Sequence, residues 1–93
     1  MLLYNKNKYS RGDHHEAIER KLNKIARQHP EIDVPIKMAI KAMWDIIRAG
    51  GGDKEIALLI AQNVQIIQSV VRDKAALLAM IDLGEELAPD LKF

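Results

Sequence analysis

Residues 53–72, DKEIALLIAQNVQIIQSVVR, form a long apolar stretch of helix length around which the rest of the chain has to pack. At the pitch of an α-helix, the aliphatic side chains of this stretch cover roughly half of the circumference, which is wider than the ~100° apolar stripe of an ordinary surface helix. They are Ile56, Leu59, Ile60, Val64, Ile66, Ile67, Val70 and Val71. A helix with so wide an apolar face has to be covered on more than one side.

An earlier helix is predicted over residues 13–29. Asp13 and Glu16 are spaced like a capping box at its start, and Pro30 stops it. Its seam has the heptad pattern with which one helix lies lengthwise against others. The seam consists of His15, Ile18, Leu22, Ile25 and His29. Residues 1–12 lack helical periodicity, and we expect them to form an extended basic arm.

Residues 34–49 should form the second helix, between start signals at Asp33 and Pro35 and the three glycines 50–52. Apolar residues occupy most of its circumference, so we expect it to be mostly enclosed. The glycines allow a sharp reversal, and Asp53 is predicted to cap the third helix. The second and third helices should therefore form an antiparallel hairpin at the centre of the fold.

The third helix could continue past Arg72, because neither Gly nor Pro interrupts VVRDKAALLAM. In a continuous helix, however, the apolar centre would move by roughly a quarter turn, and charged residues would take the place of Ile60 and Ile67. We therefore predict a break near Asp73 and a fourth helix over residues 74–88, ended by Pro89. The predicted fold class is all-α, a compact bundle of four helices in which residues 13–93 form a single domain.

Composition agrees with a small helical protein. The 93 residues suffice for one domain with one hydrophobic core, and aromatic residues make up only 4%, so the core should be aliphatic. No apolar run reaches the ~18 residues of a membrane span, so we expect no membrane contact. The chain has no cysteine, which excludes thiolate zinc sites and disulfides and fits a reducing compartment. A cytoplasmic location is expected.

Candidate catalytic and metal-binding residues are few. His15 and Glu19 lie four residues apart with His14 adjacent, a spacing at which imidazole and carboxylate can bind zinc. A third ligand is missing, since His29 is about 21 Å further along the helix. Neither serine has a histidine and an acid at a spacing that suggests a nucleophile. We expect no catalytic site, no bound metal and no cofactor.

The second and third helices carry unusual residues for a solvated surface. Asn63 lies in the middle of an apolar face, where its amide needs a hydrogen-bond partner. The opposite face of the third helix is rich in glutamine instead of Lys and Glu, which suits partial burial. Trp44 borders the thin polar stripe of the second helix. The candidate interface residues are Trp44, Leu58, Gln62, Asn63, Gln65, Gln68 and Ser69.

Charge is distributed unevenly along the chain. Residues 1–48 hold ten Lys and Arg against six acids, whereas residues 49–93 hold four against seven, with a net charge of +1. The basic half could form a surface that binds phosphates of a polyanion. Its candidate residues are Arg20, Lys24, Arg27, Lys37, Lys41 and Arg48.

The sequence favours a small non-enzymatic module for protein–protein interaction or regulation. Two adjacent helices are apolar over half or more of their circumference, which is more than one small core absorbs. The partner would be a second copy of the chain, in a homodimer, or a larger protein. The alternative is a nucleic-acid-associated regulator that uses the basic N-terminal half. A helix-turn-helix reader is disfavoured, because its second helix would have to expose polar side chains to base edges.

Overall fold

Four α-helices make up the fold of the computed structural model, which describes residues 2–72 and 74–91, with side chains from His14 onward. The helices are α1 (Leu2–Gln28), α2 (Asp33–Arg48), α3 (Asp53–Val70) and α4 (Lys74–Leu87), and a 3-10 turn, η1 (Pro30–Ile32), joins the first two. The predicted all-α bundle of four helices is confirmed.

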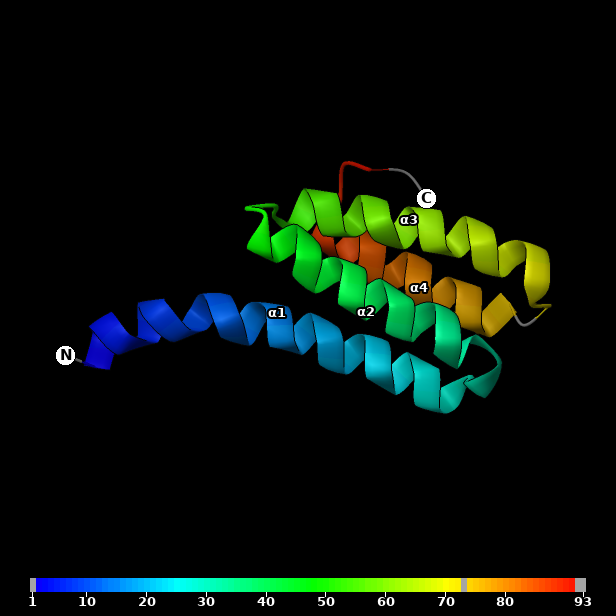
Figure 1. Cartoon of the computed structure of the whole chain (residues 1–93), viewed down its shortest axis with the longest axis horizontal. Coiled ribbons are helices and arrows are strands. Elements are labelled where there is room, and N and C mark those ends of the chain that lie inside the picture. The colour runs from blue at the N-terminus through cyan, green and yellow to red at the C-terminus, as the bar shows by residue number, and fades with distance from the viewer. Residues whose placement is uncertain (1, 73, 92–93) are drawn as a thin grey trace.

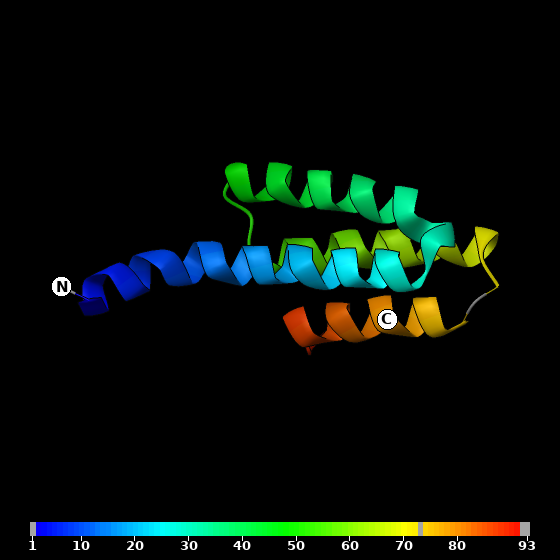
Figure 2. The ribbon, with the colours of Figure 1, turned by 90° about the horizontal axis from the view of Figure 1, so that it is seen from below.

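Consecutive helices run in opposite directions and pack side by side (Figures 1 and 2). The main contacts are those of α1 with α2 and α4, and those of α3 with the same two helices. Each helix therefore has two principal neighbours. The expectation that the second and third helices are central is wrong, because α4 packs along α3 and shares the interior with it.

The core lies where the four helices meet. Aliphatic and methionine side chains from every helix are fully buried there, including Leu22, Ile36, Met43, Ile56, Ile60, Ile67 and Met80. The predicted seam of α1 is buried from His15 to Ile25, and His29 at its end is half-buried. An aliphatic core of this kind matches the low aromatic content.

The first helix begins earlier than predicted. It starts at Leu2 and passes through Asp13 without a boundary, so the segment expected to be extended is helical and the capping-box start is not used. Its first turns project beyond the ends of the other helices (Figure 1). A helix that has already formed gains one hydrogen bond for each residue that it adds, and this propagation needs no apolar periodicity.

The remaining boundaries lie close to those predicted. The break between the third and fourth helices is confirmed: α3 ends at Val70, Val71 is extended with φ −117° and ψ 135°, and α4 begins at Lys74. Asp73 itself lies outside the described residues. The predicted N-caps are wrong by one position, since Ile32 caps α2 and Gly52 caps α3. Asp33 and Asp53 lie in the first turns, where a carboxylate still favours the helix dipole.

Candidate functional site

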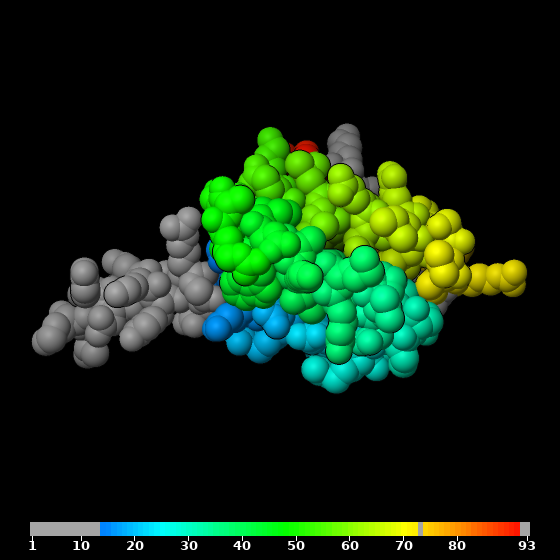
Figure 3. All heavy atoms as spheres, viewed as in Figure 1, coloured from blue at the N-terminus to red at the C-terminus, as the bar shows by residue number. Residues whose placement is uncertain are grey.

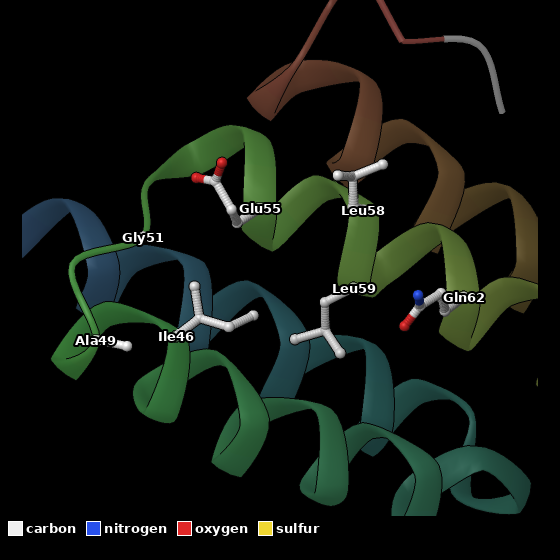
Figure 4. Close-up of a pocket in the computed structure, with 7 residues that line it drawn as sticks. All are labelled: Ile46, Ala49, Gly51, Glu55, Leu58, Leu59 and Gln62. Carbon is white, nitrogen blue, oxygen red and sulfur yellow. The ribbon is translucent and has the colours of Figure 1, made fainter.

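A hollow lies between α2 and α3, at the end of the hairpin where the two helices are joined. Its volume is about 440 Å³. Ile46 of α2 and Leu59 of α3 lie between the two helices, whereas Leu58 points away from α2 (Figure 4). The lining residues are Ile46, Ala49, Gly51, Glu55, Leu58, Leu59 and Gln62. The hollow is thus a mainly apolar depression with one carboxylate at its edge.

The turn that forms one wall of this hollow requires its glycines. Gly50 has a φ of +94°, and its N–H donates to Ile47 O while the N–H of Gly51 donates to Ile46 O, at 3.0 and 2.8 Å. This pair of bonds is a Schellman motif, which closes the last turn of α2. A Cβ on Gly51 would lie 2.4 Å from Ile46 Cγ2. Gly51 therefore allows the turn to pass directly over the Ile46 side chain.

Glu55 fastens the same turn to the start of α3. Its Oε1 accepts a hydrogen bond from the Gly52 N–H at 2.8 Å. That bond, together with one from its own backbone N–H, lowers the pKa of the Glu55 carboxyl below its ordinary value. The carboxylate at the edge of the hollow is therefore ionised at neutral pH.

Exposed apolar side chains gather on the same hairpin. Six large hydrophobic side chains are strongly exposed in the described part of the chain, and five of them belong to α2 and α3: Val34, Met38, Leu58, Ile66 and Val70. Met38, Ile66 and Val70 are 67%, 58% and 76% exposed. We call the outer surface of the α2–α3 hairpin the open face; it is turned toward the viewer in Figure 3.

The apolar features of the open face are arranged lengthwise. The hollow occupies the end near Gly51, and Ile66 and Val70, which we call the ridge, lie toward the other end of α3. Met38 lies near the middle, because Asn63 bonds to Pro35 O and thereby aligns the start of α2 with the second half of α3. The open face therefore has an apolar depression at one end and apolar projections at the other.

Asn63 lies inside the hairpin and not on its surface. It is 8% exposed, and its Nδ2 donates to Pro35 O over a long distance of 3.4 Å. Among the described residues, its buried Oδ1 has no hydrogen-bond partner. The structure thus places this candidate interface residue between α2 and α3 of one chain.

Trp44 connects α2 to α1 and lies away from the open face. Its Nε1 donates to Glu19 Oε1 at 2.7 Å, and its indole meets the ring of buried His15 edge to face, with centroids 6.2 Å apart. The indole is half-buried and packs against the core. Both its polar and its apolar parts are therefore used within the chain.

The other candidate interface residues are exposed on α3. Leu58 and Gln62 line the hollow, whereas Gln65, Gln68 and Ser69 lie further along the helix. Ser69 Oγ donates to Ile66 O at 2.8 Å. The structure therefore brings Leu58 and Gln62 together with Ile46 and Leu59 at the hollow, and it leaves Met38, Ile66 and Val70 exposed elsewhere on the same two helices.

The six basic candidates are all exposed, but they do not form a uniform cationic surface. Lys37 pairs with Asp33 at 3.8 Å, and Arg48 pairs with Asp45. Arg20, Lys24, Arg27 and Lys41 have no ion pair among the described residues. Glu16 and Glu19 line depressions beside Arg20 and Lys37 on this side of the bundle. Carboxylates thus alternate with the cations.

The histidines have protein partners consistent with a structural role. His14 Nε2 donates to the carboxylate of Asp53, 2.9 and 2.8 Å from its two oxygens, and so links α1 to the start of α3. Within residues 14–72 and 74–91, no three His, Asp or Glu side chains are grouped closely enough to hold a metal ion.

Within the described chain, no helix has both the length and the apolar character needed to cross a membrane.

Comparison of the chain with known protein families, with curated proteins and with solved structures gives no match. The surface geometry is therefore the basis for a functional proposal.

Proposed function

We propose that this protein is a non-enzymatic helical interaction module that forms a homodimer through the open face of the α2–α3 hairpin. The observation that carries the proposal is the location of exposed apolar residues: of the six large ones among residues 14–72 and 74–91, five lie on these two helices. Contiguous exposed apolar surface on a small protein typically marks a contact with another protein. A cytoplasmic location is part of the same proposal.

The charge of the open face favours a second copy as the occupant. The residues that line its hollow are neutral except for Glu55, and so are the exposed Met38, Ile66 and Val70. Two identical charged faces would repel each other, whereas two neutral apolar faces can meet without that cost. The contact would need no second sequence to supply complementary charge.

The size of the open face is also suitable. Helices of 16 and 18 residues are about 24 and 27 Å long, and neighbouring helices pack about 8–10 Å apart. A face of about 25 by 20 Å has a flat area of about 500 Å², which is at the low end for specific interfaces, since the standard size is about 800 Å² of accessible surface per partner. We therefore expect a dimer that dissociates on dilution.

A matched pair of substitutions tests this proposal. Ile66 on α3 and Leu78 on α4 are both 58% exposed, but only Ile66 lies on the hairpin. In sedimentation velocity, wild type and Leu78→Lys should form dimers at high micromolar concentration, whereas Ile66→Lys should stay monomeric with unchanged helicity. A monomeric wild type at several hundred micromolar, or equal effects of the two substitutions, would refute the proposal.

The alternative of a nucleic-acid-associated regulator has weaker support. Two of the six basic candidates are paired with carboxylates of their own helix. A phosphate-binding surface would require these cations to exchange their partners for phosphates. The open face, by contrast, needs no such exchange.

A further inference from the structure

We propose that the two copies pack hairpin on hairpin in antiparallel orientation, with the twofold axis perpendicular to the helices near Gln62, so that the ridge of each copy fills the hollow of the other. This inference rests on the proposed homodimer and specifies its geometry. Hairpin packing alone allows two arrangements with twofold symmetry, and they differ in which features of the open face meet.

Shape decides between the two arrangements. An axis parallel to the helices would lay α3 of each copy on α2 of the other, so that each ridge would meet the start of α2 and the two hollows of about 440 Å³ would face each other unfilled. An axis perpendicular to the helices exchanges the two ends of the open face. Each ridge then meets a hollow, and the same contact occurs twice, as a self-complementary interface requires. Filling apolar depressions in this way restores contacts that an unfilled void forfeits.

The spacing along α3 fits this exchange. Leu58, which lines the hollow, and Ile66 of the ridge lie four residues before and four residues after Gln62. A perpendicular axis at Gln62 therefore brings Ile66 of one copy opposite Leu58 of the other. Met38 lies near the same level of the hairpin and would pack close to the axis.

The residue at the axis is chemically suitable. A side chain on a twofold axis faces its own copy, so that a charged group there would meet an identical charge. The amide of Gln62 is neutral and has both donors and an acceptor, so two such amides can bond to each other. The ends also complement each other: Glu55 lies at the hollow, and exposed Arg72 follows the ridge by two residues.

Disulfide trapping in the full-length protein tests the geometry, because the chain contains no cysteine. On mild oxidation, Gln62→Cys should cross-link to itself. A mixture of Leu58→Cys and Ile66→Cys should give at least about tenfold more covalent dimer than either variant alone, because the dimer raises the effective concentration of the matched pair. Lys24→Cys, on the outer side of α1, is the control, and it should form disulfides no faster than random collisions between monomers allow.

The outcomes separate the geometry from the dimer itself. If Gln62→Cys fails to cross-link while a mixture of Met38→Cys and Gln62→Cys succeeds, then α2 lies on α3 of the other copy and the perpendicular axis is wrong, although the dimer stands. If wild type sediments as a monomer at every concentration, the proposed function fails as well. Efficient cross-linking of Lys24→Cys would place the contact on α1 and overturn both.

Discussion

Replacing Asn63 by Leu should stabilise the protein. Asn63 is buried between α2 and α3, its Oδ1 lacks a protein partner within the described residues, and its bond to Pro35 O is long. A buried polar group without a partner costs about 1–3 kcal/mol. The carbonyl oxygen of Pro35 lies in the first turn of α2, so it stays within the hydrogen-bonded helix when the Asn63 amide is removed. Leucine has the same number of side-chain heavy atoms and the same branching as asparagine.

The expected gain follows from two opposing effects. Removal of the unpaired amide and burial of two methyl groups stabilise the variant. The tetrahedral branch of leucine is bulkier than a planar amide, however, and overpacking typically costs about 1–3 kcal/mol. We expect a net gain of about 1–2 kcal/mol, which corresponds to about 4–15 °C in the midpoint of thermal unfolding for a domain of this size. The oligomeric mass should not change, because Asn63 is covered by its own chain.

Thermal unfolding by circular dichroism at one fixed, low protein concentration measures the gain, since dimer formation makes the midpoint depend on concentration. Asn63→Ala is the comparison that removes the amide and leaves a void, and it should be less stable than the leucine variant. If the leucine variant is less stable than wild type, Asn63 Oδ1 has a hydrogen-bond partner, and that bond stabilises the protein by more than the burial of the amide costs. An altered mass distribution would place Asn63 in the interface, as the sequence predicts.

Further expectations concern α1, the hairpin turn and the basic residues. Trp44→Ala should lower stability by about 3 kcal/mol and Trp44→Phe by about 1 kcal/mol, because phenylalanine keeps a ring but loses the bond to Glu19; equal losses in urea unfolding would contradict this. The pKa of the Glu55 carboxyl is lowered in the folded protein. Its contribution to the free energy of unfolding is therefore fully present above pH 4.5, the ordinary pKa, and is lost as the pH falls through the lowered pKa. The stability difference between wild type and Glu55→Ala should therefore shrink on acidification, and a pH-independent difference would argue against this effect. Arg20, Lys24 and Arg27 have no ion pair with any described residue, and reversing their charges should change neither helicity nor oligomeric mass. A salt-dependent affinity for RNA or DNA that is lost in that variant would favour the alternative function.

The helix boundaries could be predicted because they depend on local signals. Pro30 follows the end of α1 and the glycines 50–52 follow the end of α2, and the break before Lys74 follows from a phase shift of the apolar pattern. The N-caps were harder, since an acidic residue at the cap and one in the first turn give nearly the same sequence pattern. The helix before Asp13 has no apolar periodicity at all, so that no pattern predicts it.

The candidate site was only partly predictable, because a wide apolar arc does not say which of its edges will be covered. Ile60 and Ile66 belong to the same arc of α3, yet the first is fully buried and the second is mostly exposed. The difference depends on where α1 and α4 pack. Asn63 shows the same limit: its position in the arc indicates burial, but only the alignment of α2 shows that Pro35 faces it.

The arrangement of four helices explains why the surplus apolar surface appears on this hairpin. In the bundle, α1 offers a narrow seam to α2 and α4, and α4 covers one side of α3. Neither α1 nor α4 reaches the surface where α2 and α3 face outward together, so the apolar residues of α2 and α3 that the core does not bury remain exposed there. Exposure of Met38, Ile66 and Val70 is thus a consequence of the broad apolar faces of α2 and α3, which α1 and α4 cover only in part. If a second copy covers them, the stability of the fold and its concentration are linked, and dilution should lower the unfolding midpoint of wild type but not that of Ile66→Lys.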